Sequence, residues 1–131
     1  MDGLGDVVSR VASGFASPAA DYFEERIDLG KYLMPHPSAT FLFRSQGVSM
    51  DDAYIPHDAI LVVDRSIKAK HGHIVVAVVD GEFTVRRYVQ TTAGIFLAPE
   101  HDQYQPLHIK DGMEVIVWGV VRSIIIDAFN V

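Results

Sequence analysis

Two short segments of the sequence carry side chains that could perform hydrolytic chemistry. The first is Gly47-Val48-Ser49-Met50, in which a serine follows a β-branched and aromatic run and precedes the polar loop 51–57. A serine just past a strand end is well placed to be exposed, and the preceding glycine lets the backbone turn its amides towards a substrate carbonyl. Taken alone the tetrapeptide is a weak signal, because a serine in an ordinary turn has the same pattern.

The second segment follows a tight turn. Asp80-Gly81 separates the runs 74–79 and 82–89, and it predicts a two-residue hairpin loop with positive φ at both central positions. In the second run the period of two places Thr84 and Arg86 on one face of the strand. The opposite face, with Phe83 and Val85, is expected to face the core.

The elements around these segments are predicted to be mostly β. From Ala39 onward, short apolar runs alternate with turn residues, which is typical of a domain of antiparallel strands. The predicted strands are 39–45, 60–64, 74–79, 82–89, 94–98 and 114–126, and the last is long enough to bend at Gly119. Residues 1–37 are rich in Gly, Ala, Ser, Pro and acidic residues, so we expect a flexible N-terminal arm followed by a β-rich domain over 38–131.

Composition indicates one ordinary globular domain. The chain has 131 residues, 49% of them hydrophobic and 21% charged, and a chain of this size folds without metal or disulfide support. It has no cysteine, which fits a reducing compartment. The first thirty residues contain acidic side chains and no apolar run long enough for a signal peptide or a membrane span, so we expect a cytoplasmic protein without a membrane partner.

The net charge argues against direct nucleic-acid binding. A formal charge of −6 repels a phosphate backbone, so any connection with DNA is expected to run through a partner. One run is locally basic, and we expect it to be a solvated loop; it comprises Arg65, Lys68, Lys70 and His71.

Several motifs, in their order and spacing, resemble the LexA/UmuD (S24-type) family of self-cleaving serine proteases. They are residues 14–22 (GFASPAADY), 36–40 (HPSAT), Gly47-Val48-Ser49-Met50, Asp64 with His71-Gly72, 80–85 (DGEFTV) and 119–121 (GVV). The resemblance spans roughly residues 13 to 121. The polymerase-manager branch is favoured over the repressors, because the segment before the arm is too short for a helix-turn-helix domain.

This resemblance implies a Ser/Lys dyad that cuts the protein's own arm. Carried over residue by residue, Ser49 is the nucleophile, the amides of Ser49 and Val48 form the oxyanion hole, and Thr84 orients the base. The scissile bond is Ser13-Gly14. The family usually has Cys or Ala before this glycine, so Ser13 is a mild departure.

The base is a serious departure, since Arg86 occupies the position of the family's lysine. A buried lysine can lose its proton near neutral pH, whereas a guanidinium stays protonated in proteins. Arg86 can therefore donate hydrogen bonds but cannot accept the serine proton. General-base assistance is worth roughly 10²–10⁴-fold, so we expect self-cleavage to be strongly impaired.

Other residues are poorer candidates for the base. Arg87 has the same defect and faces the other way, and the nearby lysines lie in predicted loops; they are Lys68, Lys70 and Lys110. No spacing supports a histidine triad with Ser49; the histidines considered are His57, His71 and His73. His71 and His73 lie two apart, but two ligands do not make a metal site, and neither a metal nor another cofactor is expected.

By the same resemblance, binding matters as much as chemistry. The family implies a homodimer that associates with a UmuC-type translesion polymerase, with the RecA filament and with the replication clamp in the SOS response. The alternative is a non-catalytic dimeric interaction module on the same fold. A signal-peptidase-like enzyme is disfavoured, because no membrane anchor is visible. The aromatic residues at strand positions, such as Phe41, Phe43 and Trp118, are expected to form core or dimer contacts rather than a base-stacking platform.

Overall fold

The computed structural model describes residues 26–45, 55–56, 58–99 and 105–130. The chain divides into two compact units, Met1–Pro35 and His36–Val131. The described part of the first unit contains the short helix α3 (Leu29–Leu33), whose N-cap Asp28 accepts a hydrogen bond from the amide of Lys31 at 3.2 Å. This helix was not predicted, although an Asp cap is a known start signal. Along the described ranges, no helix is long and apolar enough to cross a membrane.

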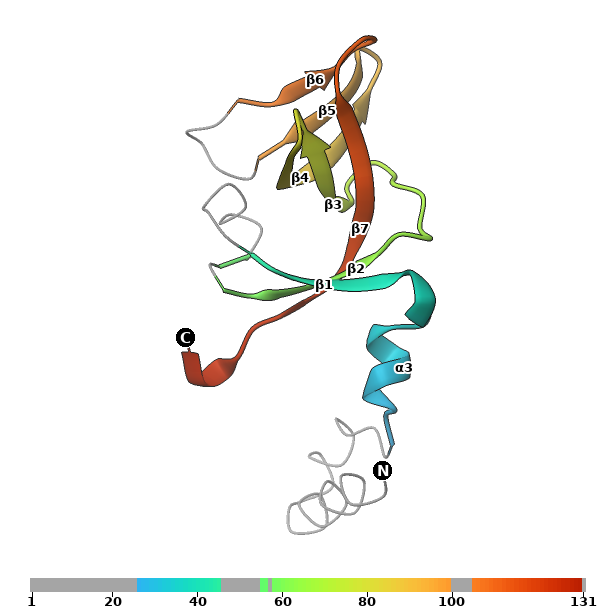
Figure 1. Cartoon of the computed structure of the whole chain (residues 1–131), viewed down its shortest axis with the longest axis vertical. Helices are drawn as coiled ribbons and strands as arrows, with labels where there is room; N and C mark the ends of the chain where they lie inside the picture. Colours follow the sequence, from blue (N-terminus) through green and yellow to red (C-terminus); the bar gives the residue numbers. More distant parts are fainter. Residues whose placement is uncertain (1–25, 46–54, 57, 100–104, 131) are drawn as a thin grey trace, which may run out of the picture. The chain divides into compact units, whose positions relative to one another are not determined.

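The second unit is one antiparallel sheet of seven strands, which confirms the predicted mostly β fold (Figure 1). The strand order is β1-β2-β7-β3-β4-β5-β6. The elements are the 3-10 helix η1 (Pro37–Ala39), β1 (Thr40–Arg44), β2 (Ile60–Asp64), β3 (Ile74–Val79), β4 (Glu82–Thr91), β5 (Gly94–Ala98), β6 (Leu107–Ile109), β7 (Val115–Ile125) and the 3-10 helix η3 (Ala128–Asn130).

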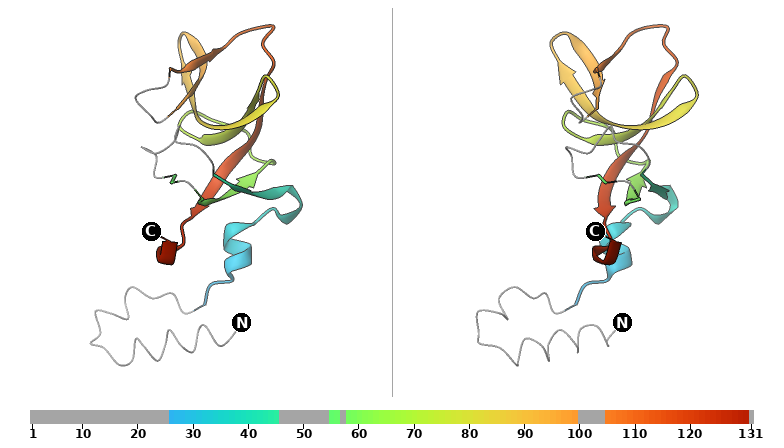
Figure 2. Two further views of the ribbon diagram at one scale, coloured as in Figure 1. Left: turned by 60° about the vertical axis from the view of Figure 1, so that its left-hand side comes forward. Right: turned by 90° about the vertical axis from the view of Figure 1, so that its left-hand side faces the viewer.

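Strand β7 joins the two parts of the sheet. Its first half pairs with β3 and its second half pairs with β2, so the long red strand of Figure 1 runs past both. Each pairing contains a register shift, which leaves Trp118 as the extra residue opposite β3 and Arg122 as the extra residue opposite β2. Such bulges bend a strand and redirect side chains. The views of Figure 2 show the resulting strong curvature of the sheet.

The predicted hairpin is confirmed. Asp80 and Gly81 have φ of 49° and 83°, the positive values that a two-residue turn of this type needs. The turn sets the register of β3 and β4, with Ala77 opposite Thr84 and Val75 opposite Arg86. The Asp-Gly turn therefore determines where the candidate base position lies in the sheet.

The prediction that β4 has a single core face is wrong. Val85 packs on one buried cluster, formed by Ile55, Leu61, Val63 and Val76. On the other face Tyr88 packs on a second cluster, formed by Val75, Ala77, Leu97 and Val120. Both faces of the curved sheet therefore bury apolar side chains. The face of β4 that carries Thr84 and Arg86 borders a buried cluster rather than open solvent.

The strand predictions agree with the structure except at β6. This strand has only three residues, and its sequence Leu-His-Ile is too short to show a periodicity. Its pairing with β5, in which Phe96 lies opposite His108, depends on contacts distant in sequence. The rings of these two residues stack with centroids 4.3 Å apart.

Candidate functional site

The described part of the candidate site is centred on β4. Arg86 is half-buried and donates a hydrogen bond from Nε to Thr84 Oγ1 at 3.2 Å. Opposite them in β3 lie Val75 and Ala77, both fully buried. The two residues that the sequence placed on one strand face thus contact each other beside an apolar wall, where an ionisable group is partly removed from water.

A pocket of about 340 Å³ opens beside Thr84. Its lining is largely apolar and comes from four strands; it comprises Phe43, Arg44, Leu61, Val76, Phe83, Thr84 and Val85. The rings of Phe43 and Phe83 lie 5.9 Å apart at its wall. A pocket with these walls suits small or apolar side chains.

The serine motif lies outside the described residues, as do the cleavage site and one candidate histidine; the residues concerned are Val48, Ser49, Ser13, Gly14 and His57. The structure does describe both flanks of the segment that carries the motif. Ser45, which is buried, donates its hydroxyl to the carbonyl of Pro56 and accepts from the amide of Ala59 at 3.1 Å. A backbone hydrogen bond joins the same two residues, since the Ser45 amide donates to the Ala59 carbonyl at 2.9 Å. Ser45 therefore ties together the two ends of the segment.

A histidine–aspartate pair was missed by the sequence reasoning. His36 Nδ1 lies 2.6 Å from Asp64 Oδ2, and the carboxylate is completely buried while half of the imidazole is exposed. The other carboxylate oxygen accepts from the amide and hydroxyl of Ser66, at 2.8 and 2.6 Å. The pair joins residues 28 positions apart, and no sequence spacing signals it.

The surroundings of Asp64 determine its ionisation. Burial alone would raise the pKa of its carboxyl, but hydrogen bonds from Ser66 and His36 outweigh burial, and the pKa lies below the ordinary value of 3.8. Asp64 is therefore ionised at neutral pH. It anchors the first residue of the second unit, because the pair links His36 to the end of β2.

The three candidate lysines lie in loops, as the sequence predicts. Lys68 and Lys70 lie between β2 and β3, and Lys110 lies between β6 and β7. His71 Nδ1 accepts from the amide of Gln90 at 3.0 Å, and His73 Nδ1 accepts from the amide of Lys70 at 3.1 Å. Both imidazoles thus bind backbone. Over the described ranges, no three His, Cys, Asp or Glu side chains gather as a metal site would require.

Comparison with known proteins assigns the chain to a family. The family model described as Peptidase S24-like matches residues 6–122. This chain therefore belongs to the Peptidase S24-like family. Within the family it is UmuD-like, as the arm and hairpin motifs predict.

Three relatives illustrate the range of the match. Protein MucA of Salmonella typhimurium is 40% identical over 121 residues, which is 92% of this chain and 82% of that protein. Protein SamA of the same species is 41% identical over 116 residues, 88% of this chain and 80% of that protein. LexA repressor 1 of Pseudomonas syringae pv. tomato is 32% identical over 121 residues, 91% of this chain but only 59% of the repressor.

Proposed function

We propose that this chain is a cytoplasmic, homodimeric UmuD-like protein of the SOS response that regulates a UmuC-type translesion polymerase, and that its self-cleavage is strongly impaired. The observation that carries the impairment is Arg86 in the position of the family's base, hydrogen-bonded to Thr84. Family membership supports the remainder of the proposal. In the same proposal the RecA filament promotes any cleavage, and the replication clamp is a further partner.

The proposed chemistry is a serine attack on the arm. The Ser49 hydroxyl oxygen bonds to the carbonyl carbon of Ser13, the amides of Val48 and Ser49 stabilise the oxyanion, and the Ser13-Gly14 bond then breaks. The hydroxyl proton must pass to a base and then to the amine of Gly14. A water molecule then attacks the ester between Ser49 and Ser13; the base takes a proton from this water and returns it to the Ser49 oxygen, so that residues 1–13 leave with a free carboxylate. A neutral lysine can carry this proton.

Arg86 cannot carry it, since its guanidinium has no free acceptor at physiological pH. It can only donate, as it does to Thr84. Without general-base assistance the rate falls by roughly 10²–10⁴-fold. The arm is then retained for far longer than in a relative with lysine.

The test is a cleavage assay on four purified proteins incubated with activated RecA filaments. They are the unaltered chain, Arg86→Lys, Arg86→Lys with Ser49→Ala, and Arg87→Lys. Mass spectrometry measures release of residues 1–13. We expect release only by Arg86→Lys. Equal rates for the unaltered chain and Arg86→Lys would refute the assigned role of Arg86, and cleavage by the Ser49→Ala double variant would refute that of Ser49.

The second candidate is a dimeric interaction module without catalysis, and Arg86 itself is the observation that favours it. If this candidate is right, Arg86→Lys does not restore cleavage, although the protein remains folded and dimeric by analytical ultracentrifugation. Restoration of cleavage by that single change would instead indicate a site that is complete except for its base.

A further inference from the structure

Strand β1 forms one edge of the sheet, and among the strands that the structure describes only β2 pairs with it. The Ser45 amide, at the end of β1, donates to the Ala59 carbonyl at 2.9 Å, so the backbone groups of Ser45 face β2. Along an antiparallel strand, residues that face the neighbouring strand alternate with residues that face away from it. The backbone groups of Thr40, Leu42 and Arg44 therefore point away from β2.

Most of these outward groups have no partner among the described residues. The Thr40 amide is used, because it donates to the Pro37 carbonyl at the end of η1. The Thr40 carbonyl and both backbone groups of Leu42 and Arg44 make no hydrogen bond within the described ranges. A row of unpaired amides and carbonyls along a sheet edge is suited to bind a further strand.

The side chains of β1 do not protect this edge. Proteins usually shield an edge strand by proline, lysine, a bulge or a very short length. β1 has the sequence Thr-Phe-Leu-Phe-Arg, pairs with β2 without a register shift and carries apolar side chains on both faces. Leu42 on one face is 60% exposed, and Phe41 on the other is 44% exposed. The opposite edge strand, β6, has only three residues, all half-buried.

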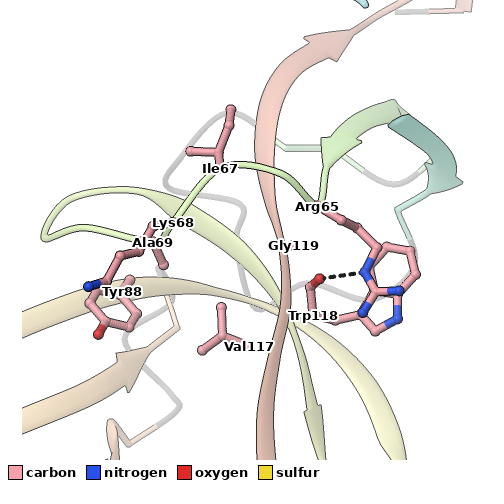
Figure 3. A pocket seen from close by; sticks show the side chains of 8 residues that line it. All are labelled: Arg65, Ile67, Lys68, Ala69, Tyr88, Val117, Trp118 and Gly119. Atoms are coloured by element: carbon pink, nitrogen blue, oxygen red, sulfur yellow. Dashed lines mark hydrogen bonds between the residues drawn. The ribbon is translucent and has the colours of Figure 1, made fainter. Parts of the chain in front are cut away.

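The aromatic face of β1 packs against β7. The rings of Phe41 and Phe43 have centroids 5.1 and 5.2 Å from that of Trp118. The Arg65 guanidinium stacks against the same indole at 4.2 Å, and its Nε donates to the Trp118 carbonyl at 2.9 Å (Figure 3). Side chains that are already ordered lose little entropy on binding. The exposed Phe41 ring is therefore an ordered apolar contact at the edge.

We propose that β1 pairs antiparallel with β1 of a second copy of this chain, about a two-fold axis at Leu42. This inference rests on the proposed homodimer and assigns its interface. In this register the amide of each Leu42 donates to the carbonyl of the other. The Arg44 amide of each copy donates to the Thr40 carbonyl of the other, so the unpaired groups of the edge become partners.

The side chains of β1 are complementary to themselves in this register. Leu42 lies opposite Leu42 of the second copy, and Phe41 lies opposite Phe43, so apolar side chains meet on both faces of the joined sheet. Such cross-strand apolar and aromatic pairs stabilise a sheet. A register centred on Arg44 would instead place two like charges opposite each other, which is unfavourable.

Charge also favours a second copy as the occupant. Arg44 is the only charged residue of β1, and it comes to lie opposite Thr40 of the other copy. Thr40 is in turn opposite Asp64 of β2, whose carboxylate is ionised. Neighbouring strands are about 4.8 Å apart, so the backbone of each Arg44 lies roughly 10 Å from that of the other copy's Asp64. This attraction opposes the general repulsion between two chains of net charge −6.

The test is dimerisation of the full chain and of two Leu42 variants, measured by sedimentation equilibrium. Leu42→Arg and Leu42→Glu each place two like charges opposite each other at the axis. We expect each change to weaken dimerisation by at least about tenfold. An equimolar mixture of the two variants should form a heterodimer, because the charges at the axis then attract. Leu42 is exposed in the single chain, so both variants are expected to fold, which circular dichroism checks.

Ile116→Arg is the matched control. Ile116 is 59% exposed, as Leu42 is, but it lies in β7 opposite β3 and not at the β1 edge. We expect this variant to dimerise as the unaltered chain does. Amide hydrogen exchange provides a second readout, since the amides of Leu42 and Arg44 should exchange slowly in the dimer and rapidly in Leu42→Arg.

The possible results separate this interface from the proposed homodimer. Dimerisation of Leu42→Arg as tight as that of the unaltered chain would overturn the interface and leave the homodimer intact. A monomeric unaltered chain would overturn both. Monomeric variants whose mixture also stays monomeric would overturn the two-fold register at Leu42. Dimerisation that is weakened in both Leu42 variants, restored in their mixture and kept in Ile116→Arg would support the proposal.

Discussion

Arg86 Nε donates a hydrogen bond to Thr84 Oγ1 at 3.2 Å, two residues earlier on the same face of β4. The sequence predicts this contact, because alternate strand residues share a face. The proposed consequence is that Thr84 orients whatever side chain stands at position 86. In the unaltered chain that side chain is a permanent donor, and the contact positions a group that cannot accept a proton.

The first prediction concerns Thr84→Val in the Arg86→Lys background. We expect the plateau rate of self-cleavage to fall by about tenfold, less than the roughly 10²–10⁴-fold lost with the base itself, because Thr84 only orients the lysine. The pH profile should also shift to lower pH, because losing an acceptor for the ammonium favours the neutral lysine. The measurement is the cleavage rate against pH, with Thr91→Val, at the exposed end of β4, as the control. If Thr84→Val changed neither the plateau rate nor the midpoint of the pH profile, Thr84 would have no role in orienting the base.

The second prediction concerns the buried carboxylate of Asp64. Asp64→Asn should lower the free energy of unfolding at neutral pH by about 1–3 kcal/mol, since it weakens the hydrogen bonds from His36 and Ser66. The folded-state pKa lies below the ordinary value of 3.8. The stabilisation by the ionised group is therefore complete above that value and is lost as the pH falls through the folded-state pKa.

Urea unfolding over a pH series measures this effect. The difference in the free energy of unfolding between the unaltered chain and Asp64→Asn should be largest near neutral pH and should become smaller in acid. Asp58→Asn is the control, because Asp58 is exposed and asparagine tolerates its positive φ of 73°. If the difference in the free energy of unfolding between the two proteins stayed constant down to the lowest pH, the assigned role of ionisation would be contradicted.

The third prediction concerns the close approach of β7 to β2. A Cβ at Gly119 would lie 2.6 Å from Val63 Cγ1, so Gly119→Ala should destabilise the domain by about 1–3 kcal/mol through overpacking. Adding Val63→Ala removes the clashing methyl. In a double-mutant cycle, the double variant should then be more stable than the sum of the single effects predicts, and simple additivity would argue against the clash.

The fourth prediction concerns the turn that sets the β3–β4 register. Gly81 has a φ of 83° with no atom near a Cβ position, so Gly81→Ala should cost about 1–2 kcal/mol through backbone conformation alone. Asp80→Asn should be nearly neutral, because Asn-Gly favours the same turn. Thermal unfolding of both variants checks this. A melting temperature of Gly81→Ala equal to that of the unaltered chain would show that the turn does not need glycine.

Much of the fold was predictable because its signals are local. The Asp80-Gly81 turn and the alternation that follows predict both the hairpin and the shared face of Thr84 and Arg86. Strand β6 was not predictable, since three residues carry no measurable period. The two-sided burial of β4 was also missed, because alternation within one strand does not reveal how the sheet curves.

The sequence by itself determined the family and the residue at the position of the family's base, since Arg86 follows a recognisable turn and a guanidinium stays protonated in any fold. Only the tertiary structure decided which distant groups meet. His36 contacts Asp64, and Ser45 joins the two flanks of the segment that carries Ser49. At the β7 bulge, the Trp118 ring stacks against the Arg65 guanidinium. These contacts depend on strand register and bulges, which arise from the packing of the whole sheet and leave no spacing in the sequence.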